Sequence, residues 1–477
     1  MDITKTHLSG ETRTEHDLLG YREIPVEYYF GIQTMRAMEN FHISRVRLHF
    51  FPDLIKGLAI VKEAAAKANK DLGVLDPVIA DAIVAACKDV KHGLFREHFV
   101  VDMVQGGAGT STNMNANEVI ANRALEVMGY ERGQYKYCHP NNHVNLSQST
   151  NDAYPTAVKI ALTFSNRRLI KAVEELVDAF RAKGVDFKDV IKMGRTQLQD
   201  AVPMTLGQEF EAYAANLAEE VDRLQTNVNL FLEVNMGATA IGTGINSDPD
   251  YTPLCVGYLN EITKLPFKAA ENMIEATNDT GAFVIYSSAV KRLAVKLSKI
   301  CNDLRLLSSG PRTGFNEINL PPMQPGSTIM PGKVNPVIPE VVNQVAFKVF
   351  GNDLVVTFAA EAGQLELNVM EPIIVHSLFE SIEMLINAMN TLRTKCVVGI
   401  TANVEHLRNM VYNSIGLVTA LNPYLGYEIS TELAATALET GKGIYDLVLE
   451  KNLMPKEELD NILKPENMVK PRKFNLK

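Results

Sequence analysis

Four short polar segments of the sequence carry the residue types that bind a small carboxylate anion. They are residues 106–117 (GGAGTSTNMNAN), 145–156 (NLSQSTNDAYPT), 194–203 (GRTQLQDAVP) and 326–336 (GSTIMPGKVNP). Each concentrates Ser, Thr, Asn and Gln beside Gly or Pro, so each is expected where a helix starts or stops. Neutral hydroxyl and amide donors bind carboxylate oxygens at modest desolvation cost, and helix N-termini add partial positive charge. Capping and turn formation explain many such clusters, but four in one chain favour a site for a small carboxylate.

The sequence contains none of the familiar metal or nucleotide motifs. It has no HExxH, paired-cysteine or EF-hand spacing, and its ten histidines are dispersed. Residues 326–333 (GSTIMPGK) fail as a phosphate loop, because five residues separate the glycines and Val334 follows the lysine where Ser or Thr would hold magnesium. Residues 105–110 (QGGAGT) follow no expected strand, so they are a weak dinucleotide motif. We therefore expect neither a metal site nor a cofactor.

The elements that must position these segments are long helices. Apolar residues recur at alternating spacings of three and four, typical of one helical face, along residues 162–180, 206–231, 283–307 and 378–392. Residues 341–370 are also helix-like, although Gly351 and Gly363 interrupt them. Helices of about 25 to 30 residues would be about 40 Å long, which indicates a helix bundle. Their broad apolar faces predict a homo-oligomer with helices at its centre.

One proline-rich stretch cannot belong to the bundle helices. Residues 308–340 contain seven of the 21 prolines and four glycines, and proline disrupts a helix interior. Helices are expected on both sides, which argues against a linker, and apolar residues such as Ile329 and Met330 argue against disorder. Long irregular loops inside compact domains are usually functional. We therefore expect a mobile active-site loop, with a structural crossing as the alternative.

Composition and charge exclude several classes of protein. The 477 residues include 47 Lys+Arg and 56 Asp+Glu, and the net charge of −9 argues against nucleic acid or an anionic membrane as partner. No run of about 18 apolar residues could span a bilayer, and residues 1–17 lack the apolar core of a secretory signal. The five cysteines are scattered, which favours the reduced thiols of a cytoplasmic protein. Strand patterns are scarce, so a Rossmann or TIM-barrel fold is not expected.

The four polar segments resemble the characteristic regions of the aspartase/fumarase superfamily. GSTIMPGKVNP is similar to its most specific motif, G-S-x-x-M-x-x-K-x-N. The resemblance covers nearly the whole chain, from LLGYR (18–22) and TMRAMENF (34–41) to LNPYLG (421–426). Residues 194–209 (GRTQLQDAVPMTLGQE) and 235–244 (NMGATAIGTG) resemble the ammonia-lyases of the superfamily most closely.

The resemblance implies a mainly α, three-domain protomer. The domains would be an N-terminal, mainly helical domain at residues 1–147, a central long-helix bundle at residues 148–404 and a small C-terminal helical domain at residues 405–477. The central helices would form the twenty-helix core of a homotetramer. Each active site would combine residues of three subunits.

The reaction that the resemblance implies is the reversible elimination of ammonia from L-aspartate to give fumarate. Removal of a Cβ proton leaves a doubly negative aci-carboxylate, and each preorganised donor aimed at that charge would be worth roughly 3–4 kcal/mol. By motif match Ser327 is the general base, and loop closure and Lys333 would supply the positive field and the exclusion of water that a serine base needs. The implied substrate-binding residues are Thr110, Ser149, Thr150, Asn151, Thr196, Thr328, Lys333 and Asn335, with Asn151 and Thr196 near the α-carboxylate and amino group.

One position departs from the commoner pattern of the superfamily. Many members have His where this sequence has Gln197, and Glu340 matches a position that often supports that histidine. Glutamine carries no titratable proton. Hydroxide needs protonation to leave, whereas a bound ammonium group can depart as neutral ammonia, so the substitution favours ammonia elimination over hydration. The alternatives are a class II fumarate hydratase and a catalytically silent helical scaffold.

Overall fold

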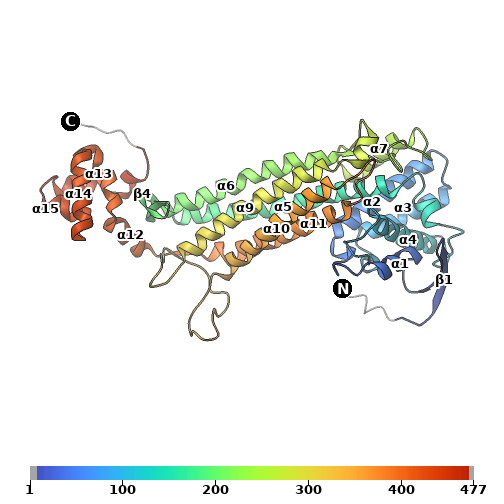
Figure 1. The fold of residues 1–477 in the computed structure, drawn as a ribbon, viewed down its shortest axis with the longest axis horizontal. Helices are drawn as coiled ribbons and strands as arrows, with labels where there is room; N and C mark the ends of the chain where they lie inside the picture. The colour runs from blue at the N-terminus through green and yellow to red at the C-terminus, as the bar shows by residue number, and fades with distance from the viewer. Residues whose placement is uncertain (1–7, 472–477) are drawn as a thin grey trace. The chain divides into compact units, whose positions relative to one another are not determined.

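Helices dominate the computed structural model, which describes residues 8–471 (Figure 1). Within that range the chain forms α1 (Ile32–Asn40), α2 (Pro52–Asp71), α3 (Pro77–Lys91), α4 (Thr110–Val127), α5 (Thr150–Asp186), α6 (Leu206–Val228), α7 (Tyr251–Thr263), α8 (Met273–Asn278), α9 (Gly281–Leu307), α10 (Val337–Glu361), α11 (Glu371–Lys395), α12 (Val404–Asn413), α13 (Val418–Leu425), α14 (Tyr427–Thr440), α15 (Ile444–Glu450), α16 (Lys456–Ile462) and α17 (Pro465–Met468). The prediction of a mainly α fold is confirmed. Of the N-terminal stretch considered as a signal, residues 1–7 lie outside the described range.

Strands are few and pair only in twos within residues 8–471. The antiparallel pairs are β1 (Thr12–Asp17) with β2 (Gly20–Pro25), β3 (Ile191–Thr196) with β4 (Gln199–Thr205), and β7 (Ile318–Asn319) with β8 (Thr401–Ala402), and the parallel pair is β5 (Glu233–Val234) with β6 (Lys268–Ala269). Among residues 8–471, none of the helices combines the length and the hydrophobicity of a membrane-spanning segment. All five cysteines are buried, and none forms a disulfide.

The five longest helices coincide with the predicted apolar stripes. They are α5, α6, α9, α10 and α11, with 37, 23, 27, 25 and 25 residues. The prediction is wrong at one end: α10 stops at Glu361, so residues 362–370 are not helical. Gly351 lies within α10, where an added Cβ would meet open space, so no close contact requires glycine at this position. The proline-rich stretch separates α9 from α10, as its composition requires.

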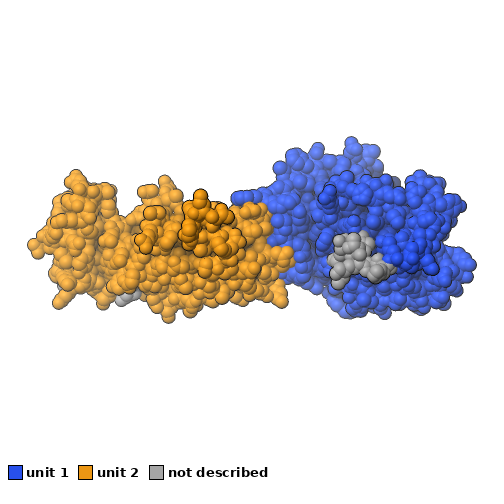
Figure 2. All heavy atoms as spheres, turned by 90° about the horizontal axis from the view of Figure 1, so that it is seen from below, with its two compact units in different colours: residues 1–170, 222–292, 347–384 blue, residues 171–221, 293–346, 385–477 orange. Residues whose placement is uncertain are grey.

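The chain divides into two compact units, coloured separately in Figure 2. Unit 1 comprises residues 1–170, 222–292 and 347–384, and unit 2 comprises residues 171–221, 293–346 and 385–477. The division falls within the five longest helices, so each of them contributes residues to both units. The division of the chain into three domains stays a prediction.

Unit 1 packs its helices closely around the start of α5. Helix α2 packs against α3, α4 and α7, and its alanines Ala59, Ala64 and Ala65 are fully buried. Where α2 meets α5, a Cβ added to Gly57 would lie only 2.3 Å from the carbonyl oxygen of Ala157. This contact fixes the position of the helix whose first turn carries predicted site residues.

Unit 2 contains a second hydrophobic core around the C-terminal helices. Buried residues of α12 to α16, among them Val411, Leu433 and Leu447, cluster with Ile191 and Met193 of strand β3. The β3–β4 hairpin therefore packs as part of this helical cluster. The hairpin carries the predicted segment at residues 194–203.

Candidate functional site

The N-terminus of α5 in unit 1 carries three of the predicted substrate-binding residues. Ser149 Oγ accepts the N–H of Asn151 at 3.2 Å, and Asp152 Oδ1 accepts the N–H of Ser149 at 2.9 Å. Both bonds cap the N-terminus of α5, so Ser149 has the capping role that its residue type also allows. Thr150 and Asn151 occupy the first turn, where the helix N-terminus favours an anion.

Asp152 also fastens a distant segment to the start of α5. Its Oδ2 accepts the N–H groups of Gly237 at 3.1 Å and Thr239 at 2.9 Å, and Asn151 Nδ2 donates to the carbonyl of Ala240 at 2.8 Å. The Asp152 side chain is fully buried. Burial raises the pKa of Asp152 to about 6, although the backbone donors act in the opposite direction. The segment that resembles the ammonia-lyases therefore lies against the first turn of α5.

Thr110 is the first residue of α4, and its side chain is exposed. Its Oγ1 donates to the carbonyl of Gly107 at 2.7 Å. Gly109 precedes it at φ 92°, and an added Cβ there would lie 2.6 Å from the ring of Tyr154. Only glycine satisfies both the positive φ and the close approach. The glycine-rich run therefore brings the N-terminus of α4 close to α5.

A buried lysine behind these residues is absent from the predicted set. Lys62 of α2 is fully buried, and its Nζ donates to Asn145 Oδ1 at 2.9 Å and to Gln148 Oε1 at 2.8 Å. Burial lowers the pKa of Lys62 to about 7, and the nearby Asp152 opposes that shift. The sequence signal for Lys62 is a lysine inside an alanine-rich, otherwise buried stretch of α2.

Amide side chains connect this lysine to the first turn of α5. Asn145 Oδ1 accepts Asn113 Nδ2 and Asn117 Nδ2, each at 3.1 Å. Asn113 Nδ2 also lies 3.2 Å from Thr150 Oγ1, to which it donates. Within unit 1 the structure thus brings together two of the four polar segments, those at residues 106–117 and 145–156.

Ser327 lies in the irregular segment between α9 and α10 of unit 2. Its Oγ accepts the N–H of Ile329 at 3.1 Å and the N–H of Met330 at 3.0 Å. Backbone N–H groups aimed at an oxygen stabilise negative charge on it. An ionised oxygen on Ser327 would therefore be stabilised by two backbone donors that an ordinary surface hydroxyl lacks.

Two hydrogen bonds close the loop that carries Ser327. The N–H of Gly326 donates to the carbonyl of Lys333 at 2.7 Å, and Asn335 Nδ2 donates to the carbonyl of Gly326 at 2.8 Å. A Cβ on Gly326 would lie 2.7 Å from the Lys333 carbonyl oxygen, so this position requires glycine. Lys333 and Thr328 are exposed, whereas Asn335 is partly buried at the base of the loop.

Thr196 lies at the end of β3 rather than at a helix terminus, so that expectation is wrong for its segment. Gln197 and Leu198 form the hairpin turn at φ 54° and 62°. Positive φ at both central residues is typical of a type I′ turn. Thr196 and Gln197 are exposed at this turn.

The hairpin is tied to the irregular segment by buried charges. Glu317 is fully buried, and its carboxylate pairs with Lys192 at 2.8 Å and with Arg195 of β3. The N–H of Asn403 donates to the carbonyl of Glu317 at 3.0 Å. Within unit 2, these contacts position the Thr196 hairpin and the segment that leads to Ser327.

The predicted site residues thus form one group in each unit. Unit 1 holds Thr110, Ser149, Thr150 and Asn151, and unit 2 holds Thr196, Ser327, Thr328, Lys333 and Asn335. No cluster of three or more His, Cys, Asp or Glu side chains within residues 8–471 could hold a metal ion.

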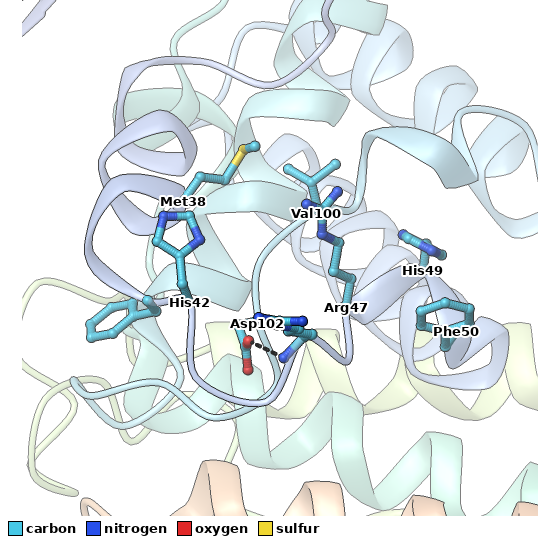
Figure 3. Close-up of a pocket in the computed structure, with 9 residues that line it drawn as sticks. Met38, His42, Arg47, His49, Phe50, Val100 and Asp102 are labelled. Carbon is cyan, nitrogen blue, oxygen red and sulfur yellow. Dashed lines mark hydrogen bonds between the residues drawn. The ribbon is translucent and has the colours of Figure 1, made fainter. Parts of the chain in front are cut away.

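A separate cavity of about 640 Å³ lies in unit 1 (Figure 3). Its lining contains none of the nine predicted residues and consists of Met38, Phe41, His42, Arg45, Arg47, His49, Phe50, Val100 and Asp102. The Asp102 carboxylate, labelled in Figure 3, accepts the backbone N–H of Arg45 at 2.9 Å and the hydroxyl of Ser44 at 2.5 Å. These bonds hold the connection that follows α1.

Comparisons with known families match most of the chain. A family model described as lyase fits residues 20–351, and one described as the fumarase C C-terminus fits residues 417–470. The chain is 61% identical over 469 residues to an aspartate ammonia-lyase of Pseudomonas aeruginosa, which covers 98% of this chain and 99% of that protein. The chain belongs to the aspartase/fumarase superfamily.

Solved structures agree with this assignment. The fold is similar to a Brucella melitensis structure described as fumarate lyase:delta crystallin bound to cobalt, with a TM-score of 0.94 and 55% identity over 97% of this chain and 100% of that one. It is also similar to a class II fumarase of Schistosoma mansoni, with a TM-score of 0.91 and 36% identity over 97% of this chain and 100% of that one.

Proposed function

We propose that this protein is an aspartate ammonia-lyase, which converts L-aspartate reversibly to fumarate and ammonia. Curated relatives of that name are 55–61% identical over nearly the whole chain, whereas the class II fumarase is 36% identical. Gln197 at the hairpin turn agrees with this choice, because departing ammonia needs no added proton.

Ser327 is the proposed general base, which removes the Cβ proton of aspartate. The observation that carries this role is the pair of N–H groups, from Ile329 and Met330, that point at its Oγ. These donors would lower the cost of an ionised serine oxygen, and a closed loop would exclude water from it. The exposed ammonium of Lys333 on the same loop would add positive charge next to the β-carboxylate.

The remaining residues bind and orient the substrate in this proposal. Removal of the proton makes the β-carboxylate a doubly negative aci-carboxylate, which hydroxyl and amide donors stabilise. The donors are Thr110, Ser149, Thr150, Thr328, Lys333 and Asn335 around the carboxylates, with Asn151 and Thr196 near the α-carboxylate and amino group. Ammonia then leaves from Cα as the double bond of fumarate forms.

The proposed assembly is a homotetramer with a twenty-helix core, in which three subunits complete each active site. Exposed apolar side chains on α10, among them Phe347, Leu354 and Phe358, support an interface between subunits. The proposed location is the cytoplasm, with the three-domain division given above. A sedimentation experiment that finds only monomer at micromolar concentration contradicts this assembly.

The test of the reaction is its dependence on ammonium. Fumarate incubated with the protein should be consumed only when ammonium is present. The loss of absorbance at 240 nm measures this consumption. Consumption without ammonium would identify a fumarate hydratase instead. No loss of fumarate, with or without ammonium, would indicate a catalytically silent scaffold.

A further inference from the structure

The ammonium group of Lys62 faces the side chains of two partly buried amides, Asn145 and Gln148. A lysine ammonium has three N–H donors and no acceptor, so Asn145 and Gln148 must turn their carbonyl oxygens toward Nζ. The geometry agrees at Gln148, whose Nε2 donates to the carbonyls of Val144 at 3.0 Å and Leu146 at 3.1 Å. Asn145 Nδ2 likewise donates to the carbonyl of Gln148 at 3.1 Å, so the N–H donors of Lys62 and these backbone carbonyls favour the same orientation of both amides.

The same constraint passes from Asn145 to Thr150. Because Asn145 Oδ1 is an acceptor, Asn113 must present its Nδ2 to it, and that Nδ2 also donates to Thr150 Oγ1. With Asn113 turned over, two amide oxygens would face each other. Thr150 Oγ1 accepts from Asn113, so its own O–H is left to donate in another direction.

This arrangement leaves two buried acceptors without partners. Asn113 Oδ1 and Asn117 Oδ1 have no hydrogen-bond partner within the described part of the chain. Leaving a buried acceptor unpaired is unfavourable, and such a group in a native structure calls for an explanation. Asn113 Oδ1 stays unpaired because Asn113 Nδ2 is held toward Asn145 and Thr150.

We propose that Lys62 is a positioning residue that directs the Thr150 hydroxyl as a donor toward a substrate carboxylate. The path runs from Lys62 through Asn145 and Asn113, and Lys62 itself does not touch the substrate. The inference rests on the proposed function, which places Thr150 at the carboxylates. It adds an explanation of how the hydrogen bond from Thr150 is oriented.

A double-mutant cycle tests the path. We expect Lys62→Met and Thr150→Val each to lower kcat/KM for L-aspartate by about 10- to 100-fold, the range for one charge-assisted hydrogen bond. The double variant should lose little more than Thr150→Val alone, since both remove the same interaction. The matched control is Lys67→Met on the same helix, whose side chain is 25% exposed and pairs with Glu261, and it should leave kcat/KM unchanged.

The outcomes separate this inference from the proposed function. Losses that multiply in the double variant, or an unaffected Lys62→Met enzyme, overturn the inference while Thr150 keeps its role. An unaffected Thr150→Val enzyme contradicts the proposed function at Thr150 and the inference with it. If Lys62→Met does not assemble, Lys62→Gln enters the same cycle. It keeps an N–H donor without the charge and should show the same coupling, and independent losses overturn the inference.

Discussion

The ammonium group of Lys192 lies 2.8 Å from the carboxylate of Glu317, and both side chains are almost completely buried. The two residues are far apart in the sequence, one in strand β3 and the other in the irregular segment that follows α9. Their ion pair, with Arg195 as a second cation, joins the hairpin of Thr196 to the segment that leads to Ser327. Separating such a pair is unfavourable, because each buried charge would lose the partner that compensates it. The ion pair therefore keeps the two segments together.

Glu317→Gln should therefore destabilise the protein. Breaking a buried pair costs about 3–5 kcal/mol, and Glu209, which also pairs with Lys192, should keep the loss near the lower end. Urea unfolding followed by circular dichroism measures it at fixed protein concentration. Glu405→Gln, an exposed acid of α12, is the control and should change little. Equal stability of the two variants would show that the ion pair of Glu317 does not contribute to the free energy of unfolding.

Ser327→Ala should abolish most of the turnover while the assembly stays intact. A general base contributes typically a hundred- to ten-thousand-fold, so kcat for L-aspartate should fall by about that factor. Fumarate formation at 240 nm measures turnover, and sedimentation measures assembly. Ser308→Ala in the same irregular segment should behave like the unaltered protein. Near-normal turnover in Ser327→Ala rules out the base assignment.

Lys333→Ala should weaken substrate binding more than it changes the fold. Loss of a charge-assisted hydrogen bond to a carboxylate costs about 1.5–3 kcal/mol, so KM for aspartate and for fumarate should rise by about 10- to 100-fold. Lys188→Ala removes an exposed lysine of the same unit and should leave both constants unchanged. Unchanged Michaelis constants in Lys333→Ala would argue against its contact with a carboxylate.

His98 should make the protein less stable in acid. Burial lowers the pKa of His98 to about 4, helped by Arg132 and Arg13 and opposed by Glu97, and its Nδ1 accepts the N–H of Tyr29. Since an unfolded histidine has a pKa near 6.5, the unfolded state binds more protons between pH 6.5 and 4. This contribution to stability is complete above pH 6.5, and about 3 kcal/mol is lost as the pH falls to 4.

His98→Asn should remove this part of the pH dependence. Asparagine places an acceptor near the position of Nδ1 but does not titrate. Urea midpoints measured from pH 7 to pH 4 should fall less steeply in His98→Asn than in the unaltered protein. His92→Asn changes an exposed histidine and should follow the unaltered protein. Parallel slopes for all three proteins would contradict the role of His98.

The sequence predicts the long helices well because their apolar residues repeat with the helical period. The prediction fails where the backbone adopts a conformation that the residue types do not indicate. Gln197 and Leu198 adopt positive φ although neither is glycine or asparagine. Because the usual residues of a tight hairpin turn are missing, the sequence predicts a helix end at Thr196 instead of a hairpin. The end of α10 at Glu361 is missed because the apolar residues continue beyond it.

The site is predictable only as far as motifs reach. The loop of Ser327 and the α5 N-terminus lie in motifs, whereas Lys62 is a single lysine in a helix, where a solvent-exposed role is the ordinary interpretation. Its burial depends on packing against segments distant in sequence, which spacing within α2 cannot reveal. The same holds for Glu317 and its partners in β3.

The boundary between the two units runs through the middle of α5, α6, α9, α10 and α11. Separating the two units would therefore require one cut in each of the five helices and would leave ten new helix ends with unpaired amides and carbonyls. Shortening or lengthening one of these helices would shift its register against the helices packed beside it. Changes of chain length should thus be tolerated in the connections between helices and not within the bundle.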